Sequence, residues 1–508
     1  MVTKVIFLVV FFAIMVGVGV YSRKHATNVN DFVLGGRAVG PWLTAFAYGT
    51  SYFSAVVFVG YAGQFGFKYG ISATWIGIGN ALIGSLLAWV ILGRRTRVMS
   101  KHLNAATMPD YFGKRYDSKA LKIAASAISF VFLIPYTASV YNGLSRLFGM
   151  AFDIPYTACV IAMAALTGVY VILGGYMATA INDFIQGIIM LFGIVAVIAA
   201  VLNGQGGFYE AVMKLSEIES DVPLTMGQKG VFASFFGPDL PNLIGVVILT
   251  SLGTWGLPQM VQKFYAIKDE KSIKSGTIIS TFFAIVVSGG CYFLGGFGRL
   301  FDSPAIYSES GSIIYDAIVP TMLSTLPDIL VGIVVVLVLS ASMSTLSSLV
   351  LTSSSTLTLD LLKDNVIKDM DEKKQLLVMR IMLVFFIVIS VVIALDPPAF
   401  IAQLMGISWG ALAGAFLAPF MYGLYWKKTT KAAVWASFAC GVLITVSNLF
   451  LKFIASPINA GAITMVVGLI IVPIVSLLTP KMETKKVDEI FSCLDETVVV
   501  HRKSSIEE

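Results

Sequence analysis

The feature that most constrains the fold of this chain is the regular return of apolar segments long enough to cross a lipid bilayer. An α-helix of about 20 apolar residues spans the hydrocarbon core of a membrane. Such segments are long and uniformly apolar here, whereas the strands of a membrane barrel are short and alternate in polarity. The sequence therefore predicts an all-α polytopic membrane protein with about thirteen transmembrane helices. Their windows are residues 3–22, 41–66, 72–92, 123–148, 157–175, 184–202, 240–262, 276–300, 328–358, 377–395, 399–425, 432–453 and 459–478.

The overall composition supports this prediction and excludes a soluble globular domain. Of the 508 residues, 57% are hydrophobic and only 13% are charged, a balance outside the range of soluble proteins. The net charge is +6, but no basic patch with interleaved aromatic residues accompanies it. We therefore expect the lipid bilayer as a partner and no nucleic acid.

The positions of the basic residues predict the topology. If the N-terminus is outside, successive loops alternate between inside and outside, and most lysines and arginines, Lys263 among them, fall in inside segments. Cytoplasmic loops carry such an excess. We therefore expect a multi-pass protein of the cell (plasma) membrane with its N-terminus outside and its C-terminus cytoplasmic. The exceptions lie in long loops or at the ends of spans: Lys4, Lys68, Arg146, Lys214, Lys229, Arg299 and Lys452.

Residues suited to catalysis or metal binding are few and scattered. The histidines all fall in segments expected on the cytoplasmic side, and the cysteines share no metal or redox spacing. The chain also lacks the glycine-rich loop ending in Gly-Lys-Ser/Thr that would bind ATP. An enzyme and an ATP-driven pump are therefore disfavoured. The residues concerned are His25, His102, His501, Cys159, Cys291, Cys440 and Cys493.

A run of hydroxyl side chains lies inside one of the apolar windows. Residues 341–348 read Ala-Ser-Met-Ser-Thr-Leu-Ser-Ser. On a helix, Ser344 and Ser348 share a face with Ala341, and Thr345 lies beside them. Hydroxyl groups cost free energy in hydrocarbon unless they find partners. The run indicates close helix packing, a water-filled cavity or a cation site.

Two windows carry interruptions at matching positions, five spans apart. The second window contains Tyr48-Gly-Thr-Ser-Tyr-Phe-Ser54, and the seventh contains Thr250-Ser-Leu-Gly-Thr-Trp-Gly-Leu-Pro258. Broken helices at corresponding positions of two halves are typical of a transporter site at the middle of the membrane. Either interruption alone is as well explained by a kink or by close packing.

Asp183 is a further candidate, at the start of the window 184–202. A carboxylate at the edge of a span is often a helix N-terminal charge that water and the helix dipole satisfy. Its alternative is an ion or proton ligand that faces the interior of the bundle. The residues alone favour neither.

Several motifs together resemble the sodium/solute symporter family. They are Phe32-Val-Leu-Gly-Gly-Arg37, Met108-Pro-Asp-Tyr-Phe112, Gly174-Gly175 followed by Asn182-Asp183 and Gln186, and the run 341–348. The resemblance covers nearly the whole chain and implies a LeuT-type core of two inverted five-helix repeats, with one helix before it and two after.

This resemblance divides the chain into six segments. Residues 1–36 would form the extra N-terminal helix and a cytoplasmic loop, and residues 37–203 and 240–425 the two inverted repeats. Residues 204–239 would form an extracellular loop between the repeats. Residues 426–480 would form the two C-terminal helices, and residues 481–508 a cytoplasmic tail, disordered or weakly helical.

The resemblance also implies which residues bind sodium ions. The principal ion would be held by backbone at the first interruption and by a carbonyl and two hydroxyls of the eighth core helix: Thr50, Phe53, Ala341, Ser344 and Thr345. Some relatives have a second sodium site, which maps here to Asp183, Ser344, Ser347 and Ser348. Na+ is thus the expected coupling ion, with one or two ions in each cycle.

The substrate pocket would lie between the first, third, sixth and tenth core helices. Sugar-transporting relatives have a glutamine where this chain has Val57, and sialic-acid-like relatives have an arginine where it has Tyr136. Proline carriers match Tyr136, but they have an aspartate in place of Tyr52. The segment 51–60 is more similar to pantothenate and monocarboxylate carriers. The expected pocket residues are Ser51, Tyr52, Phe53, Ser54, Val57, Tyr136, Asn142, Thr250, Thr254, Trp255, Gln403 and Met405.

The expected function is sodium-coupled symport of a small organic solute by alternating access. The favoured solute is a small carboxylate or a related organic anion. The alternative is proline or another amino acid. An ion channel is a competing class that would also use hydroxyls in the membrane, but no repeated filter loop is visible.

Overall fold

A computed structural model describes residues 2–152, 155–363, 365–367, 370–396 and 401–495, and all regular secondary structure within those ranges is helical. His501 lies outside the described residues. The principal helices are α1 (Val2–Ser22), α2 (Val29–Leu34), α3 (Pro41–Tyr52), α4 (Ala62–Tyr69), α5 (Thr74–Gly79), α6 (Arg94–His102), α7 (Met108–Arg115), α8 (Lys119–Phe152), α9 (Tyr156–Gly204), α10 (Phe208–Ser216), α11 (Leu240–Leu252), α12 (Pro258–Ala266), α13 (Glu270–Gly295), α14 (Tyr315–Ser324), α15 (Asp328–Thr356), α16 (Glu372–Leu395), α17 (Ile401–Tyr425), α18 (Lys431–Leu451), α19 (Pro457–Leu478) and α20 (Thr484–Ser492).

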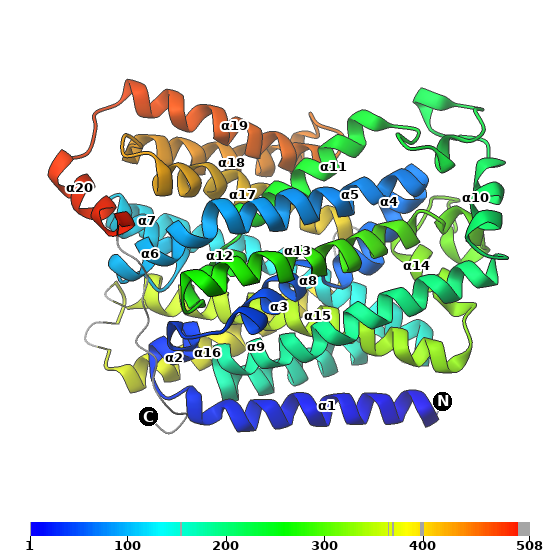
Figure 1. The fold of residues 1–508 in the computed structure, drawn as a ribbon, viewed down its shortest axis with the longest axis horizontal. Coiled ribbons are helices and arrows are strands. Elements are labelled where there is room, and N and C mark those ends of the chain that lie inside the picture. Colours follow the sequence, from blue (N-terminus) through cyan, green and yellow to red (C-terminus); the bar gives the residue numbers. More distant parts are fainter. Residues whose placement is uncertain (1, 153–154, 364, 368–369, 397–400, 496–508) are drawn as a thin grey trace.

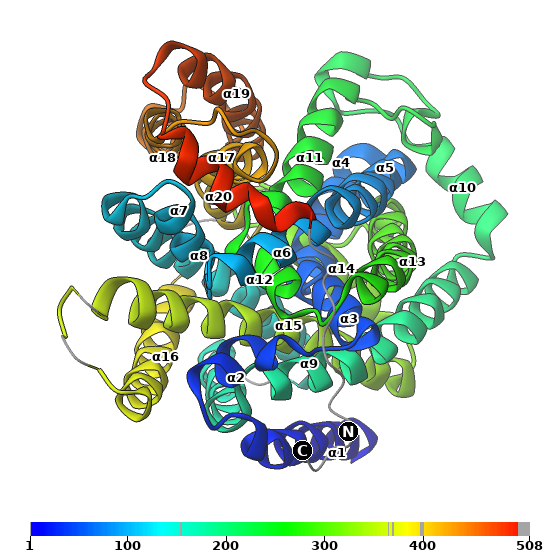
Figure 2. The same cartoon turned by 60° about the vertical axis from the view of Figure 1, so that its left-hand side comes forward.

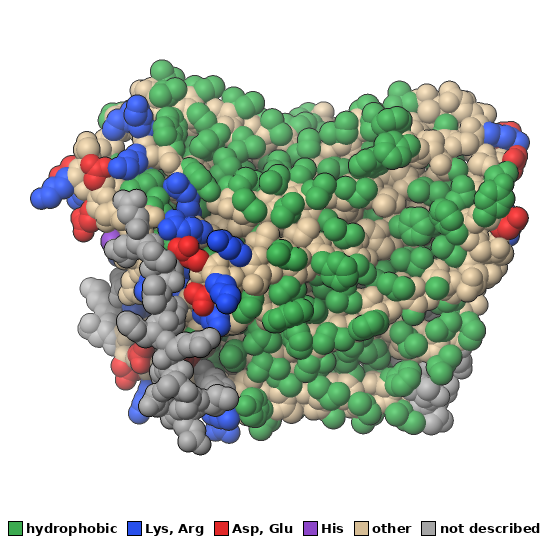
Figure 3. Space-filling model, in the orientation of Figure 1, with side chains coloured by type: hydrophobic (Ala, Val, Ile, Leu, Met, Phe, Trp, Pro, Cys, Tyr) green, Lys and Arg blue, Asp and Glu red, His purple; other side chains and the backbone are tan. Residues whose placement is uncertain are grey.

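The long helices lie side by side along one direction (Figure 1). In the space-filling view of Figure 3, apolar side chains cover the broad middle, while most lysines and arginines lie at the end that carries α6 and α20. We call this the basic end. The start of α1 lies at the opposite end (Figure 1). This distribution is that of a bundle that crosses a membrane.

The described residues contain nine helical segments long and apolar enough to cross a membrane, or ten if the bent pair α11 and α12 counts as one span. Thirteen were expected. The numbers differ partly because α9, at 49 residues, contains two of the expected windows. Gly175, at φ 54° and ψ −144°, bends α9 between them, in a conformation that glycine adopts far more readily than other residues. The apolar part of α1 is also too short for this criterion, and the window 41–66 is divided by the end of α3.

Two of the sequence motifs meet at that bend. A side chain at Gly175 would lie 2.7 Å from the carbonyl oxygen of Phe32, and one at Gly35 would lie 3.2 Å from the Tyr176 ring. The glycines thus let α2 approach the backbone of α9 closely. The motifs Phe32–Arg37 and Gly174–Gly175 therefore act together in packing.

Both expected interruptions are present. In the first, α3 ends at Tyr52, and Phe53 adopts φ −107° and ψ 86°. A π-helical turn then begins at Val56. In the second, α11 and α12 meet at an angle of 48°, where Leu257 is extended and Pro258 starts the new helix without an N–H to donate. Seen nearly end on in Figure 2, α3, α12 and α15 lie in the middle of the bundle.

The first part of the C-terminal tail is ordered as α20. This helix buries Val487, Ile490 and Phe491 and forms ion pairs at the basic end, from Lys486 to Asp117 at 2.8 Å and from Asp488 to Lys427 at 2.7 Å. The exposed ion pairs contribute little, so the buried apolar face holds the helix. Of the two forms expected for the tail, the helical one is therefore present at residues 484–492.

Close backbone contact between α4 and α13 gives a test of the packing. A Cβ atom at Gly295 would lie 2.1 Å from the carbonyl oxygen of Ala62, whereas one at Gly289 on the same helix would meet nothing within 4 Å. We expect Gly295→Ala to destabilise the protein by roughly 1–3 kcal/mol, because the two backbones must separate. Gly289→Ala should be neutral or slightly stabilising. Thermal unfolding in detergent measures both, and equal behaviour of the two variants would contradict this packing.

Candidate functional site

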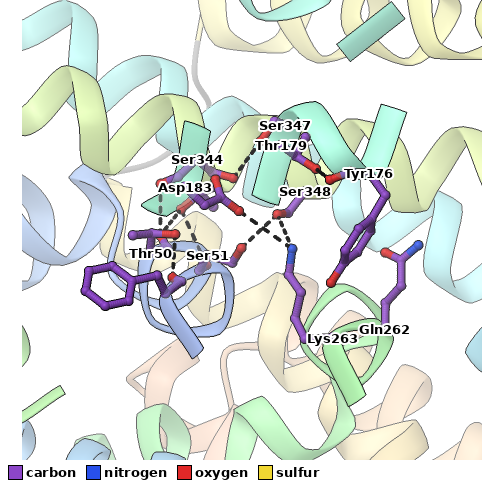
Figure 4. Close-up of polar contacts among 12 residues, drawn as sticks. Thr50, Ser51, Tyr176, Thr179, Asp183, Gln262, Lys263, Ser344, Ser347 and Ser348 are labelled. Carbon is purple, nitrogen blue, oxygen red and sulfur yellow. Dashed lines mark hydrogen bonds and ion pairs between the residues drawn. The ribbon is translucent and has the colours of Figure 1, made fainter. Parts of the chain in front are cut away.

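The hydroxyl run on α15 faces the broken end of α3. Ser344 Oγ lies 3.1 Å from the Thr50 carbonyl oxygen, and Thr345 Oγ1 lies 3.2 Å from the same atom. Both hydroxyls also lie 3.2 Å from the Ala341 carbonyl oxygen. All of these residues are buried, and Figure 4 shows Thr50 and Ser344 turned toward each other. Four of the five residues expected at the principal sodium site therefore form one cluster.

The end of α3 explains why carbonyl oxygens are free at this point. The last carbonyls of a helix have no partner one turn further on, and α3 ends two residues after Thr50. Phe53, the fifth expected residue, follows directly at the break. Neutral carbonyl and hydroxyl oxygens at this spacing suit a monovalent cation that must also leave. The neighbouring Ser342 donates instead to Val338 on its own helix, at 2.7 Å.

A second polar cluster adjoins the first and contains an unexpected lysine. Lys263 Nζ lies 2.9 Å from Ser348 Oγ and 3.9 Å from Asp183 Oδ2. Ser348 Oγ in turn lies 2.7 Å from Ser51 Oγ, and Figure 4 shows Lys263 reaching between these groups. Ser347, also expected at a second sodium site, donates to the Ser344 carbonyl at 2.9 Å.

The prediction that Lys263 belongs to an inside loop is therefore wrong. Its side chain is 2% exposed, because α12 continues to Ala266 beyond the apolar window and is buried along its length. Asp183 is fully buried as well, so it is not a solvated helix terminus.

Aromatic rings line the space beside the first cluster. Tyr52 stacks on Phe53 with ring centroids 4.2 Å apart, and its ring lies 6.1 Å from that of Trp409. Trp409 meets Tyr136 edge to face at 5.9 Å. Tyr136 Oη and Trp409 Nε1 are buried and form no hydrogen bond of normal geometry with the described residues, although the Tyr136 hydroxyl lies close to Trp409 and Ser54. Three of the expected pocket residues are thus brought together by a tryptophan that was not expected.

The other expected pocket residues divide into two groups. Thr250 accepts a hydrogen bond from Tyr52 Oη at 2.5 Å, while Thr254 and Trp255 donate to the carbonyls of Gly84 and Ile83. These three join the broken span to its neighbour. Ser51 turns toward Ser348, Ser54 accepts from the Val56 N–H, and Asn142 contacts Arg146. Val57 and Met405 are buried, and Gln403 is partly exposed.

Trp409 and Lys263 could not have been chosen from their local sequence. Trp409 lies one helical turn beyond Met405 on α17. Of the first 20 residues of this helix, 18 are buried, so its sequence shows no clear inward face from which a residue could be selected. Such a helix, apolar on all sides, hides its functional side. Lys263 stood at the edge of a window, where basic residues usually mark a loop.

Outside the membrane spans, a buried carboxylate connects α14 to α17. Asp316 Oδ2 accepts a hydrogen bond from the Ile401 N–H at 3.2 Å, at the first turn of α17. Burial raises the pKa of Asp316 to about 6, although the Ile401 N–H and the charge of Arg146 act in the opposite direction. The contact thus joins α14 to the first turn of α17 through a carboxylate whose pKa is raised to about 6.

Replacing Asp316 by asparagine tests this contact. The ordinary aspartate pKa is about 4, so between about pH 4 and 6 the unfolded chain ionises before the folded one, and wild-type stability should fall as pH rises through this window. The fall should be much smaller in Asp316→Asn and unchanged in the exposed control Glu309→Gln. Thermal unfolding measured from pH 4 to 7 tests this expectation. An unaltered pH dependence in Asp316→Asn would contradict the raised pKa of Asp316.

Comparison with known proteins gives consistent matches. The sequence pattern of the sodium:solute symporter family matches residues 32–441. A sodium/proline symporter of Staphylococcus aureus (strain JH9) is 31% identical over 463 residues, which cover 87% of this chain and 85% of that protein.

Two solved structures share the fold. A Na+-coupled sialic acid symporter in a substrate-bound outward-open state superimposes with a TM-score of 0.77 at 18% identity, over 95% of this chain and 98% of that one. A nucleobase-cation-symport-1 family transporter in a closed conformation gives a TM-score of 0.51 at 11% identity, over 90% and 97%. These matches confirm the expected all-helical, LeuT-type fold.

Proposed function

The chain belongs to the sodium:solute symporter family, and we propose from this premise that it carries a small carboxylate together with sodium. The protein is a membrane transporter that uses sodium as its coupling ion. What we propose is the identity of the solute and the residues that bind the solute and the sodium ion. The observation that carries it is the meeting of the α3 break with the hydroxyls of α15, beside two unpartnered donors.

The principal sodium ion is assigned to the cluster of Thr50, Phe53, Ala341, Ser344 and Thr345. The support is the short distances from the two hydroxyls to the Thr50 and Ala341 carbonyls. Bound sodium would attract these oxygens and hold α3 against α15. The last turn of α3 carries the negative end of its helix dipole, which favours a cation.

The carboxylate is supported by the groups that remain free beside this ion. Tyr136 Oη and Trp409 Nε1 are buried donors that form no hydrogen bond of normal geometry within the described part of the chain, and they suit carboxylate oxygens. The N-terminus of α12 at Pro258 adds the positive end of a helix dipole. The rings of Tyr52, Phe53 and Trp409 leave an apolar surface for the rest of a small solute.

Proline or another amino acid is the second candidate, because the matched Staphylococcus aureus relative is named a sodium/proline symporter. An amino acid also carries an ammonium group, which needs acceptors or a negative charge. Tyr52 stands where proline carriers have an aspartate, and the buried Asp183 pairs with Lys263. Monocarboxylates are therefore favoured over amino acids.

We propose that the protein lies in the plasma membrane. Its basic end would face the cytoplasm. The support is the gathering of lysines and arginines at that end in Figure 3, which matches the charge asymmetry of cytoplasmic loops. The N-terminus would then lie outside. Sodium and solute would enter from the opposite end, and rocking of one repeat against the other would release both inside.

A thermal-shift screen with and without sodium tests the solute class. Purified protein is mixed with monocarboxylates, amino acids and sugars in sodium or in potassium buffer. We expect a small monocarboxylate to raise the unfolding temperature in sodium only, because the ion completes the pocket. Stabilisation by proline but by no carboxylate would favour the second candidate, and stabilisation that is equal in potassium would contradict the coupling.

Thr345→Ala tests the sodium site. It removes one hydroxyl ligand and leaves the helix intact, so apparent sodium affinity should weaken tenfold or more, equivalent to about 1.4 kcal/mol. Ser342→Ala is the matched control, since Ser342 lies on the same helix but bonds only within it. Sodium titration of the unfolding temperature measures both variants. A Thr345→Ala protein with wild-type sodium affinity would rule out this ligand.

Tyr136→Phe tests the carboxylate contact. Loss of one hydrogen bond to a charged group costs roughly 1.5–3 kcal/mol, so solute affinity should fall about tenfold or more while sodium binding alone is preserved. Tyr141→Phe is the control, because its buried hydroxyl on the same helix also lacks a partner but lies on another face. Binding of labelled solute decides, and equal losses in the two variants would argue against a contact at Tyr136.

A further inference from the structure

We propose that the ammonium group of Lys263 occupies the position of a second coupling cation, so that the protein binds one sodium ion in each cycle. This inference rests on the proposed function, because it takes the principal sodium site as given. It assigns Lys263 the role of a cation tethered to the protein, held by residues that would otherwise ligate sodium.

The position of Lys263 carries the inference. Of the four residues expected at a second sodium site, Ser348 accepts a hydrogen bond from the ammonium at 2.9 Å and Asp183 lies 3.9 Å from it. The remaining two, Ser344 and Ser347, bond to carbonyls close by on α15. The ammonium thus contacts the charged member and one hydroxyl of the set. Figure 4 shows its nitrogen directed at both groups.

The ammonium group of Lys263 is the counterion of Asp183, because both side chains are buried. The Lys263 side chain is 2% exposed and that of Asp183 is 0% exposed. A buried charge needs a partner of opposite sign, and here each provides the other's. The Tyr176 ring, with its centroid 5.2 Å from Nζ, adds a favourable face for a cation.

Charge balance then disfavours a second sodium ion. The pair of Asp183 and Lys263 is neutral, so one sodium ion at the neutral principal site leaves a single net positive charge. A second sodium ion beside Asp183 would lie against the ammonium group in a region closed to water, where like charges repel strongly. Both Asp183 oxygens lack a hydrogen-bond donor among the described residues. They are therefore available to a small cation once the ammonium is removed.

The contact also joins three helices that a transport cycle must separate. Lys263 comes from α12, whereas Asp183 comes from α9 and Ser348 from α15. A sodium ion can leave such a site, but the ammonium remains attached to α12. Movement of α12 away from α9 and α15 must therefore break these contacts on every cycle, without delivering a second ion.

Counting bound sodium tests the proposal directly. Equilibrium binding of radioactive sodium to the purified protein at saturating concentration should give one ion for the wild type and two for Lys263→Gln. The double variant Lys263→Gln/Asp183→Asn should return to one, because it lacks the charged ligand. The exposed Lys427→Gln variant, which removes a lysine at the surface, is the control and should bind one ion. Sodium should also raise the unfolding temperature of Lys263→Gln by more than that of the wild type.

Two results would overturn the inference. The first is a wild type that binds two sodium ions, with Asp183→Asn reducing the number to one, a comparison that does not depend on whether Lys263→Gln folds. The second is a folded Lys263→Gln protein that still binds one ion. A wild type that binds no sodium would overturn the principal site as well, so failure of the proposed function is distinguishable from failure of this inference alone.

Discussion

The rest of the structure depends on one constraint, that a helix which ends inside a membrane must satisfy its last carbonyl oxygens without water. The end of α3 at Tyr52 exposes the Thr50 carbonyl, and the hydroxyls of Ser344 and Thr345 meet it at hydrogen-bond distance. The polar meeting point lies at the centre of the bundle, and the aromatic rings of Tyr52 and Phe53 begin immediately beside it. The proposed ion site and the proposed solute site thus both adjoin the same break.

The buried charges are also paired. The buried Asp183 is matched by Lys263 from a different helix, so the centre of the membrane holds a neutral pair beside a neutral set of oxygens. One sodium ion bound there would add a single positive charge to an otherwise neutral site. The charged pair and the oxygen cluster lie on one side of the break. The aromatic residues lie on the other, with the Tyr136 and Trp409 donors that form no hydrogen bond of normal geometry among the described residues.

The sequence predicted the features that depend on composition and on short motifs. Apolar windows, both helix breaks and the hydroxyl run follow from residue types along the chain, because membrane helices tolerate polar residues and interruptions only where something uses them. Lys263 and Trp409 depend instead on which face of a helix points inward. In α12 the polar face of Gln259, Gln262 and Lys263 is buried rather than exposed, and α17 is buried on nearly all sides. A helix was one of the two forms expected for the tail, but the packing of α20 was not predicted, because its apolar face is short and its partners lie elsewhere in the chain. The division into two inverted repeats, both sodium sites and the solute pocket remain predictions.

The most direct test of sodium-coupled carboxylate transport is uptake of a labelled monocarboxylate into proteoliposomes under imposed ion gradients. An inward sodium gradient should drive transient accumulation above the external concentration, and an ionophore that dissipates the gradient should abolish it. An equal potassium gradient should drive none. Accumulation that proceeds equally without sodium would contradict the proposed mechanism.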